Sequence, residues 1–144
     1  MNAKVFVDTN VFIYLQSTTD SEKRIMSQIV IDTFNCVGST HVLNEISNVL
    51  SRKAKFSFTQ IGEIVDGIVQ SCEIVIVNYG TVRKAHEIAQ KYQFGYYDSL
   101  IISSALESNC KFLFSEDLTD GQIIEKVLTV VNIFKHPELL PVST

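Results

Sequence analysis

The chain has 144 residues, of which 46% are hydrophobic and 19% charged, and its formal net charge is -4 at pH 7. This length fits one domain over residues 1–144 with a substantial core, and the charge excludes a generic basic nucleic-acid binder. The three cysteines are widely spaced and the N-terminus lacks a signal-peptide pattern, so we expect a reducing cytoplasm, no disulfide framework and no membrane span.

Apolar strands alternate with amphipathic helices through the first half of the chain. The polar run Asp8-Thr9-Asn10 separates the first strand from the first helix. The expected elements are a strand at Lys4–Val7, a helix from Val11, a helix from Asp20, a strand at Cys36–Gly38, a helix capped by Ser39 or Thr40, and a helix whose Ser57 and Gln60 match a capping box.

The second half continues this alternation. The expected elements are a strand at Glu73–Val77, helices at Thr81–Tyr92 and Asp98–Leu106, a strand at Lys111–Phe114, a loop at Ser115–Gly121, a strand at Leu128–Phe134, and an irregular tail containing Pro137 and Pro141. The order predicts an α/β fold of three layers, in which helices flank a central, mostly parallel sheet of about five strands.

Four acidic residues stand at informative places in this pattern: Asp8, Glu45, Asp98 and Asp117. Asp8 and Asp117 follow strands, and ligands of parallel sheets bind beyond the carboxyl ends of strands. Glu45 lies at the margin of an apolar helix stripe, and Asp98 shares a helix face with Ile101. Carboxylates that converge repel each other unless a cation joins them. The pattern therefore suggests a divalent metal site that acts on phosphate esters.

Each acid also has an ordinary interpretation. Asp8 and Asp98 could be helix N-caps, although Asn10 could cap the first helix in place of Asp8. Glu45 could be a solvated flank of its helix. Asp117 lies in an acidic loop, where Glu116 and Asp120 compete with it for an inward position. For Tyr96 and Tyr97, which precede Asp98, we expect packing in the core or at the rim rather than stacking on a nucleobase.

The four acids lie in segments that resemble the motifs of the PIN-domain nuclease family, and in particular its VapC-like toxins. The matching segments, in chain order, are Val7-Asp8-Thr9-Asn10-Val11-Phe12-Ile13, Leu43-Asn44-Glu45-Ile46, Tyr97-Asp98-Ser99-Leu100-Ile101, and Phe114-Ser115-Glu116-Asp117-Leu118 with Gly121. Their order and spacing cover residues 5–121.

The resemblance implies an endoribonuclease that depends on Mg²⁺ or Mn²⁺ and cuts single-stranded or structured RNA, such as tRNA or rRNA. It also implies a homodimer and a cognate antitoxin that occludes the site. By position, the acids that hold the metal and carry catalysis would be Asp8, Glu45, Asp98 and Asp117. Supporting roles would fall to Thr9, Asn10 and Ser115. Whether one or two metal ions bind stays open.

The expected chemistry is hydrolysis by metal-bound water, because no histidine lies in the motifs. Arg52, Lys53 and Lys55 could hold RNA phosphates, or could simply be solvated at a helix end. Two alternatives are a catalytically silent module that binds RNA or protein and a housekeeping nuclease of RNA processing. A phosphoaccepting receiver domain is disfavoured, because Asn78-Tyr79-Gly80 follows the middle strand and offers no acid.

Overall fold

The computed structural model describes residues 3–141, and its centre is a six-stranded sheet of order β3-β2-β1-β4-β6-β5. All neighbouring strands run parallel except the β5–β6 pair. The strands are β1 (Lys4–Val7), β2 (Asn35–Ser39), β3 (Glu73–Val75), β4 (Phe112–Phe114), β5 (Ile123–Ile124) and β6 (Leu128–Val131).

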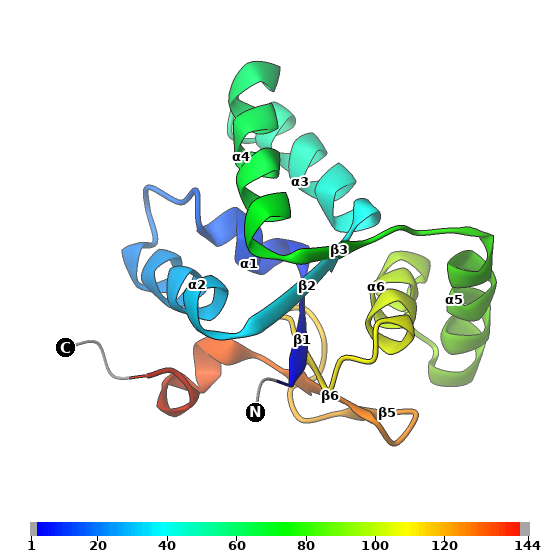
Figure 1. Ribbon diagram of the computed structural model, residues 1–144. Coiled ribbons are helices and arrows are strands. Elements are labelled where there is room, and N and C mark those ends of the chain that lie inside the picture. The colour runs from blue at the N-terminus through cyan, green and yellow to red at the C-terminus, as the bar shows by residue number, and fades with distance from the viewer. Residues whose placement is uncertain (1–2, 142–144) are drawn as a thin grey trace.

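Helices cover both faces of this sheet. In Figure 1, α1 and α2 lie on one side of β1, and α5 and α6 lie on the other. The helices are α1 (Thr9–Tyr14), α2 (Ser21–Thr33), α3 (Thr40–Arg52), α4 (Phe58–Ser71), α5 (Tyr79–Tyr92) and α6 (Tyr96–Glu107), followed by the 3₁₀ turns η1 (Ile133–Lys135) and η2 (Pro137–Leu139). Among residues 3–141, none of these helices is both long and apolar enough to cross a membrane.

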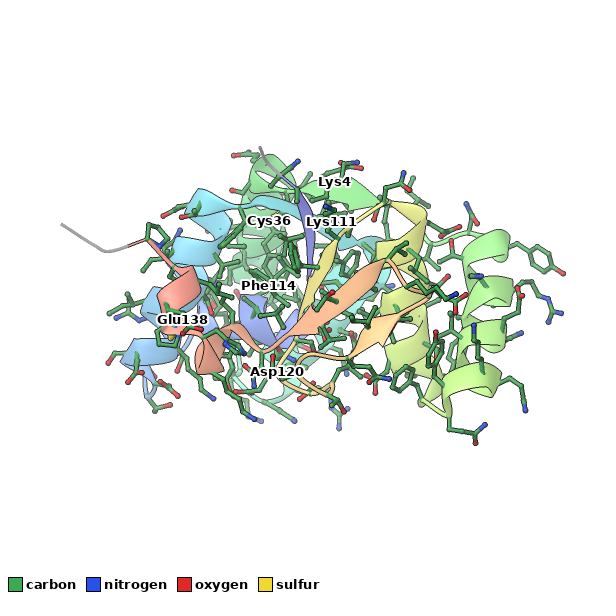
Figure 2. All side chains as sticks on the ribbon, turned by 90° about the horizontal axis from the view of Figure 1, so that it is seen from below. Lys4, Cys36, Lys111, Phe114, Asp120 and Glu138 are labelled. Carbon is green, nitrogen blue, oxygen red and sulfur yellow. The ribbon has the colours of Figure 1, made fainter. Side chains whose placement is uncertain are left out.

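The core forms between the sheet and these helices. Phe6 and Leu113 are fully buried on the central strands, and Phe12 and Ile102 pack against them from α1 and α6. Helix α6 is buried on most of its circumference because it lies between the sheet and α5. Figure 2 shows the labelled Phe114 among the crowded side chains at the centre. Helix α6 is therefore a rigid support for whatever its first turn presents.

The predicted fold class is confirmed: the sheet is mostly parallel and flanked by helices. One strand was missed, and the ends of two others were predicted too late in the chain. The two-residue edge strand β5 was missed because it is too short to show alternation. Strand β3 ends at Val75 rather than Val77, and β6 ends at Val131, after which Asn132 caps the turn η1.

Three helices begin earlier than the sequence pattern predicted, and two of these starts bear on the acids. Asp8, not Asn10, is the N-cap of α1, and its side chain accepts a hydrogen bond from the Thr9 amide. Helix α6 begins at Tyr96 after Gly95 as N-cap, so Asp98 lies inside the first turn and is not a cap. Helix α5 begins at Tyr79 because Asn78 forms a capping box with Thr81.

Candidate active site

The carboxyl ends of β1 and β4 place two of the acids side by side. The Asp8 amide donates to the carbonyl of Phe114, the last residue of β4, at 3.0 Å, which extends the parallel pairing one residue past the end of β1. Ser115 follows β4 and donates its amide to Val131 at 3.1 Å. In Figure 2, the labelled Lys4 and Lys111 lie at one end of the sheet and Asp120 lies at the other. The acids thus gather at the edge where ligands of parallel sheets bind.

A pocket of about 390 Å³ opens at this edge, and all four predicted acids line it. Asp8 and Asp117 come from the ends of β1 and β4, Glu45 comes from the middle of α3, and Asp98 comes from the first turn of α6. The remaining lining residues are Thr9, Asn10, Ile13, Tyr14, Val49, Lys53, Tyr97 and Ile101. Segments distant in the sequence therefore converge as the motif order predicted.

Three polar side chains each bind a different acid of this pocket. The Ser115 hydroxyl donates to Asp8 Oδ2 at 2.7 Å. The Thr9 hydroxyl donates to Glu45 Oε1 at 2.6 Å.

The third is Asn10, whose amide Nδ2 donates to Asp117 Oδ2 at 3.0 Å. Within residues 3–141, the carboxylate of Asp98 makes no hydrogen bond. Three acids are thus held in fixed orientations by neutral donors, while the fourth keeps all its lone pairs free.

Asp8 carries the strongest electrostatic perturbation of the four. Its side chain is only 5% exposed. Burial raises the pKa of Asp8 to about 6, against the lowering effect of its hydrogen bonds from Ser115 and Thr9, and the charges of Glu45 and Asp117 add to the increase. A buried carboxylate that is pushed toward its neutral form is a place where a cation would be strongly favoured.

Glu45 and Asp98 shift in opposite directions. Burial acts to raise the pKa of Glu45, but His41 and the Thr9 hydroxyl outweigh it, and the pKa is lowered. His41 Nε2 lies 3.3 Å from Glu45 Oε1, within ion-pair distance, although this buried nitrogen lacks a well-aligned hydrogen bond. The pKa of Asp98 is raised by burial and by the charges of Asp117 and Glu45. A bound cation would therefore relieve Asp98 as well as Asp8.

The structure also separates Asp117 from its two acidic neighbours. Glu116 turns away from the pocket and pairs with Lys23, and it also accepts a hydrogen bond from the Tyr14 hydroxyl at 2.7 Å. Asp120 accepts from the Asn132 amide at 2.8 Å and contacts His136 Nε2 at 2.7 Å. Of these three acids, Asp117 alone lines the pocket.

Some of the predicted basic residues and tyrosines line the pocket and others lie outside it. Lys53, at the end of α3, lines the pocket, whereas Arg52 and Lys55 are exposed outside it. Tyr97 lines the pocket from the rim.

Sequence reasoning missed His41, whose ring stacks on that of Tyr97 with centroids 5.0 Å apart. The available signal was its spacing of four residues before Glu45 on one helix, which places the two side chains together.

The donor set of the pocket fits a hard divalent cation. Four carboxylates are available, and the pKa shifts of Asp8 and Asp98 reflect burial and mutual repulsion that a cation would relieve. Within residues 3–141, however, no group of three Asp, Glu, His or Cys side chains is arranged as a ready-made metal site. The four acids line one pocket, but among the described residues their carboxylates are not yet close enough to bind one ion together.

Comparison with known proteins gives one family and one fold. The family model of the PIN domain matches residues 5–119. A search of curated protein sequences found no significant match.

Three solved structures illustrate the fold. VapC20 of Mycobacterium tuberculosis, a toxin that cleaves the sarcin-ricin loop, is 14% identical, with a TM-score of 0.66 over 78% of this chain and 89% of that one. VapBC2 from Rickettsia felis, bound to a DNA fragment from its promoter, is 18% identical, with a TM-score of 0.65 over 88% and 98%. A toxin–antitoxin complex from Klebsiella pneumoniae is 16% identical, with a TM-score of 0.67 over 89% and 96%. At these identities the likeness establishes a shared fold.

Proposed function

The chain belongs to the PIN domain family, and from this premise we propose that it is a Mg²⁺- or Mn²⁺-dependent endoribonuclease that serves as the toxin of a toxin–antitoxin pair. The observation that carries the proposal is the convergence of Asp8, Glu45, Asp98 and Asp117 on one pocket. PIN nucleases generally use divalent metals. The proposed substrate is single-stranded or structured RNA, such as tRNA or rRNA.

In this proposal the four acids would hold the metal, which would supply Lewis-acid activation of water and neutralise charge that develops on the phosphate. The chain's own residues prepare the pocket. Thr9, Asn10 and Ser115 fix three of the carboxylates, so that little reorganisation is needed when the substrate binds.

A positive charge on the pocket wall is available to bind the substrate. Lys53 lines the pocket and can attract an RNA phosphate. Because the chain carries a net charge of -4, this local positive charge matters more than it would in a basic protein.

The toxin role is supported by the kind of complexes that share the fold. The Rickettsia felis structure is of VapBC2 bound to promoter DNA, and the Klebsiella pneumoniae structure is a toxin–antitoxin complex. By analogy we propose a cognate antitoxin that occludes the pocket. The family resemblance also leads us to propose a cytoplasmic location and a homodimer. Light scattering of the purified chain would test the dimer.

Expression in a bacterial host tests the toxin role. The wild-type chain should arrest growth when induced alone, and the Asp98→Asn variant at matched protein level should not. Asp98 is the better choice than Asp8 because its side chain makes no hydrogen bond among the described residues, so the substitution leaves the fold intact. Equal growth of the two strains would favour a housekeeping nuclease of RNA processing or a silent module that binds RNA or protein.

A further inference from the structure

We propose that Tyr97 and Tyr96, with His86 and Arg83, form a stacking track that holds unpaired bases of the RNA next to the acidic pocket. The inference rests on the proposed ribonuclease function and adds to it how the substrate is gripped. The track selects RNA whose bases are free to stack, and Arg83 holds the phosphate backbone at its outer end.

The rings of this track form a continuous series of contacts. His41 and Tyr97 stack with centroids 5.0 Å apart and planes 9° apart. Tyr97 contacts Tyr96 edge-on at 5.4 Å, and Tyr96 lies 5.7 Å from His86 on α5. Arg83 Nη1 donates to His86 Nδ1 at 2.9 Å. From His41 to Arg83, each side chain in the track therefore contacts the next one.

The inner end of the track belongs to the pocket, and the outer end is open to solvent. Tyr97 lines the pocket beside Asp98. Tyr97 is 63% exposed and Tyr96 is 38% exposed, whereas the His41 side chain beneath Tyr97 is largely buried. His86 and Arg83 on α5 are exposed as well, and Figure 2 shows side chains of α5 that project outward from the molecule. The stack therefore has a fixed inner layer and an accessible outer one.

Of the two kinds of packing expected for these tyrosines, the structure shows the one at the rim, because neither tyrosine lies in the core. Packing at the rim does not by itself require that Tyr97 stack in parallel on the buried His41 ring. Nor does it require that Arg83 lie at the other end of the row of rings, beside His86. Ring faces bind bases of any identity, and a nearby guanidinium adds attraction for phosphate. A chain with a net charge of -4 needs such local contacts to hold RNA.

Binding of short single-stranded RNA to the full-length Asp98→Asn protein tests the track without cleavage. We would compare an oligoadenylate of about ten nucleotides with an abasic ribose-phosphate oligomer of the same length and charge. Fluorescence anisotropy of an end-labelled oligomer measures the affinity, because this reporter is unchanged when a tyrosine of the chain is replaced. Tyr79, which is 79% exposed at the start of α5 and lies outside the track, provides the matched control.

The oligoadenylate should bind about tenfold more tightly than the abasic oligomer. Tyr97→Leu should abolish this preference and Tyr96→Leu should reduce it, while Tyr97→Phe and Tyr79→Leu should keep it. Arg83→Gln should weaken both oligomers equally and reduce the slope of log affinity against log salt by about 0.7.

Four outcomes would overturn the track. In the first, Tyr97→Leu and Tyr96→Leu keep the preference for the oligoadenylate over the abasic oligomer, just as the control Tyr79→Leu does. Another is a change of molecular mass in solution on Tyr97→Leu, since the surface would then be an interface between proteins. If neither oligomer binds but the wild type still cuts RNA, the track is wrong and the ribonuclease function stands. If the wild type neither binds nor cuts RNA, both proposals fail.

Discussion

The Thr9 hydroxyl donates a 2.6 Å hydrogen bond to Glu45 Oε1, and so joins the first turn of α1 to the middle of α3, 36 positions away. The two residues come from different motifs, on two helices that pack against each other. Because the same oxygen lies 3.3 Å from His41 Nε2, Glu45 is held from two sides. This arrangement keeps the carboxylate charged and aimed at the pocket.

Replacing Thr9 with Val removes that donor at nearly constant volume. The pKa of Glu45 should rise, because the Thr9 hydroxyl contributes to its lowering. The variant should lose about 1 kcal/mol of stability at neutral pH. A carboxylate with a lowered pKa stabilises the fold above its ordinary pKa of 4.5, so the loss should shrink as the pH falls below that value.

Urea unfolding of the Thr9→Val protein at several pH values measures this loss. Thr9→Ser, which keeps the hydroxyl, is the control and should stay close to the wild type. A loss of the same size in both variants, or one that does not change with pH, would show that the hydrogen bond to Glu45 is not the cause.

Asp98→Asn should leave the metal-free protein equally stable or more stable. The substitution removes a charge whose pKa is raised by burial, by Asp117 and by Glu45, and among the described residues it breaks no hydrogen bond. Gly95 rather than Asp98 caps α6, so no cap is lost. Thermal melts in EDTA compare the variant with the wild type. A strongly lowered melting temperature would mean that Asp98 has a structural role at the start of α6.

Asp8 should titrate near pH 6 in the metal-free protein, well above its ordinary pKa of 3.8. Since the folded-state value is the higher one, protonation stabilises the fold. Its contribution is full below pH 3.8 and is lost as the pH rises through about 6. From about 1.4 kcal/mol per pKa unit, the loss is about 3 kcal/mol above that range.

NMR of the Asp8 carboxyl carbon in EDTA follows this titration directly. Asp8→Asn can still accept the Thr9 amide as a helix cap. It should therefore be more stable than the wild type at pH 7.5, and this advantage should disappear near pH 4. A carboxyl that titrates at its ordinary pKa would contradict the desolvated environment described here.

Mg²⁺ or Mn²⁺ should raise the melting temperature of the wild type, because a ligand that binds only the folded state stabilises it by mass action. The increase should be abolished or greatly reduced in Asp98→Asn. Glu116→Gln is the matched control, since Glu116 follows the same strand but faces Lys23 instead of the pocket. An equal increase in the wild type and Asp98→Asn would place the metal elsewhere on the protein.

Much of this architecture could be predicted from the sequence. The alternation of elements predicted a parallel sheet, and the parallel sheet predicted that acids after β1 and β4 would meet. The choice among Glu116, Asp117 and Asp120 could not be predicted, because it depends on distant partners. Lys23 draws Glu116 away, and Asn132 binds Asp120. Such contacts leave no periodic signal within the loop itself.

Asp8 shows a second limit of sequence reasoning. A helix N-cap and a pocket acid were treated as alternatives, yet Asp8 serves as the cap and also lines the pocket. Its Oδ1 accepts from the Thr9 amide at 2.7 Å, and its Oδ2 accepts from Ser115 at 2.7 Å. Likewise, the spacing of His41 and Glu45 is visible in the sequence, but the stack of His41 on Tyr97 arises only when α3 and α6 meet.

The most direct test of the account is analysis of the ends that the purified protein leaves on a structured RNA such as tRNA. With Mg²⁺ or Mn²⁺, hydrolysis at the acidic pocket predicts fragments with 5′-phosphate and 3′-hydroxyl ends. Cutting should stop in EDTA and in Asp98→Asn, and Glu116→Gln should cut like the wild type. Cyclic-phosphate ends, or cutting that survives complete chelation, would contradict the proposed roles of Asp8, Glu45, Asp98 and Asp117.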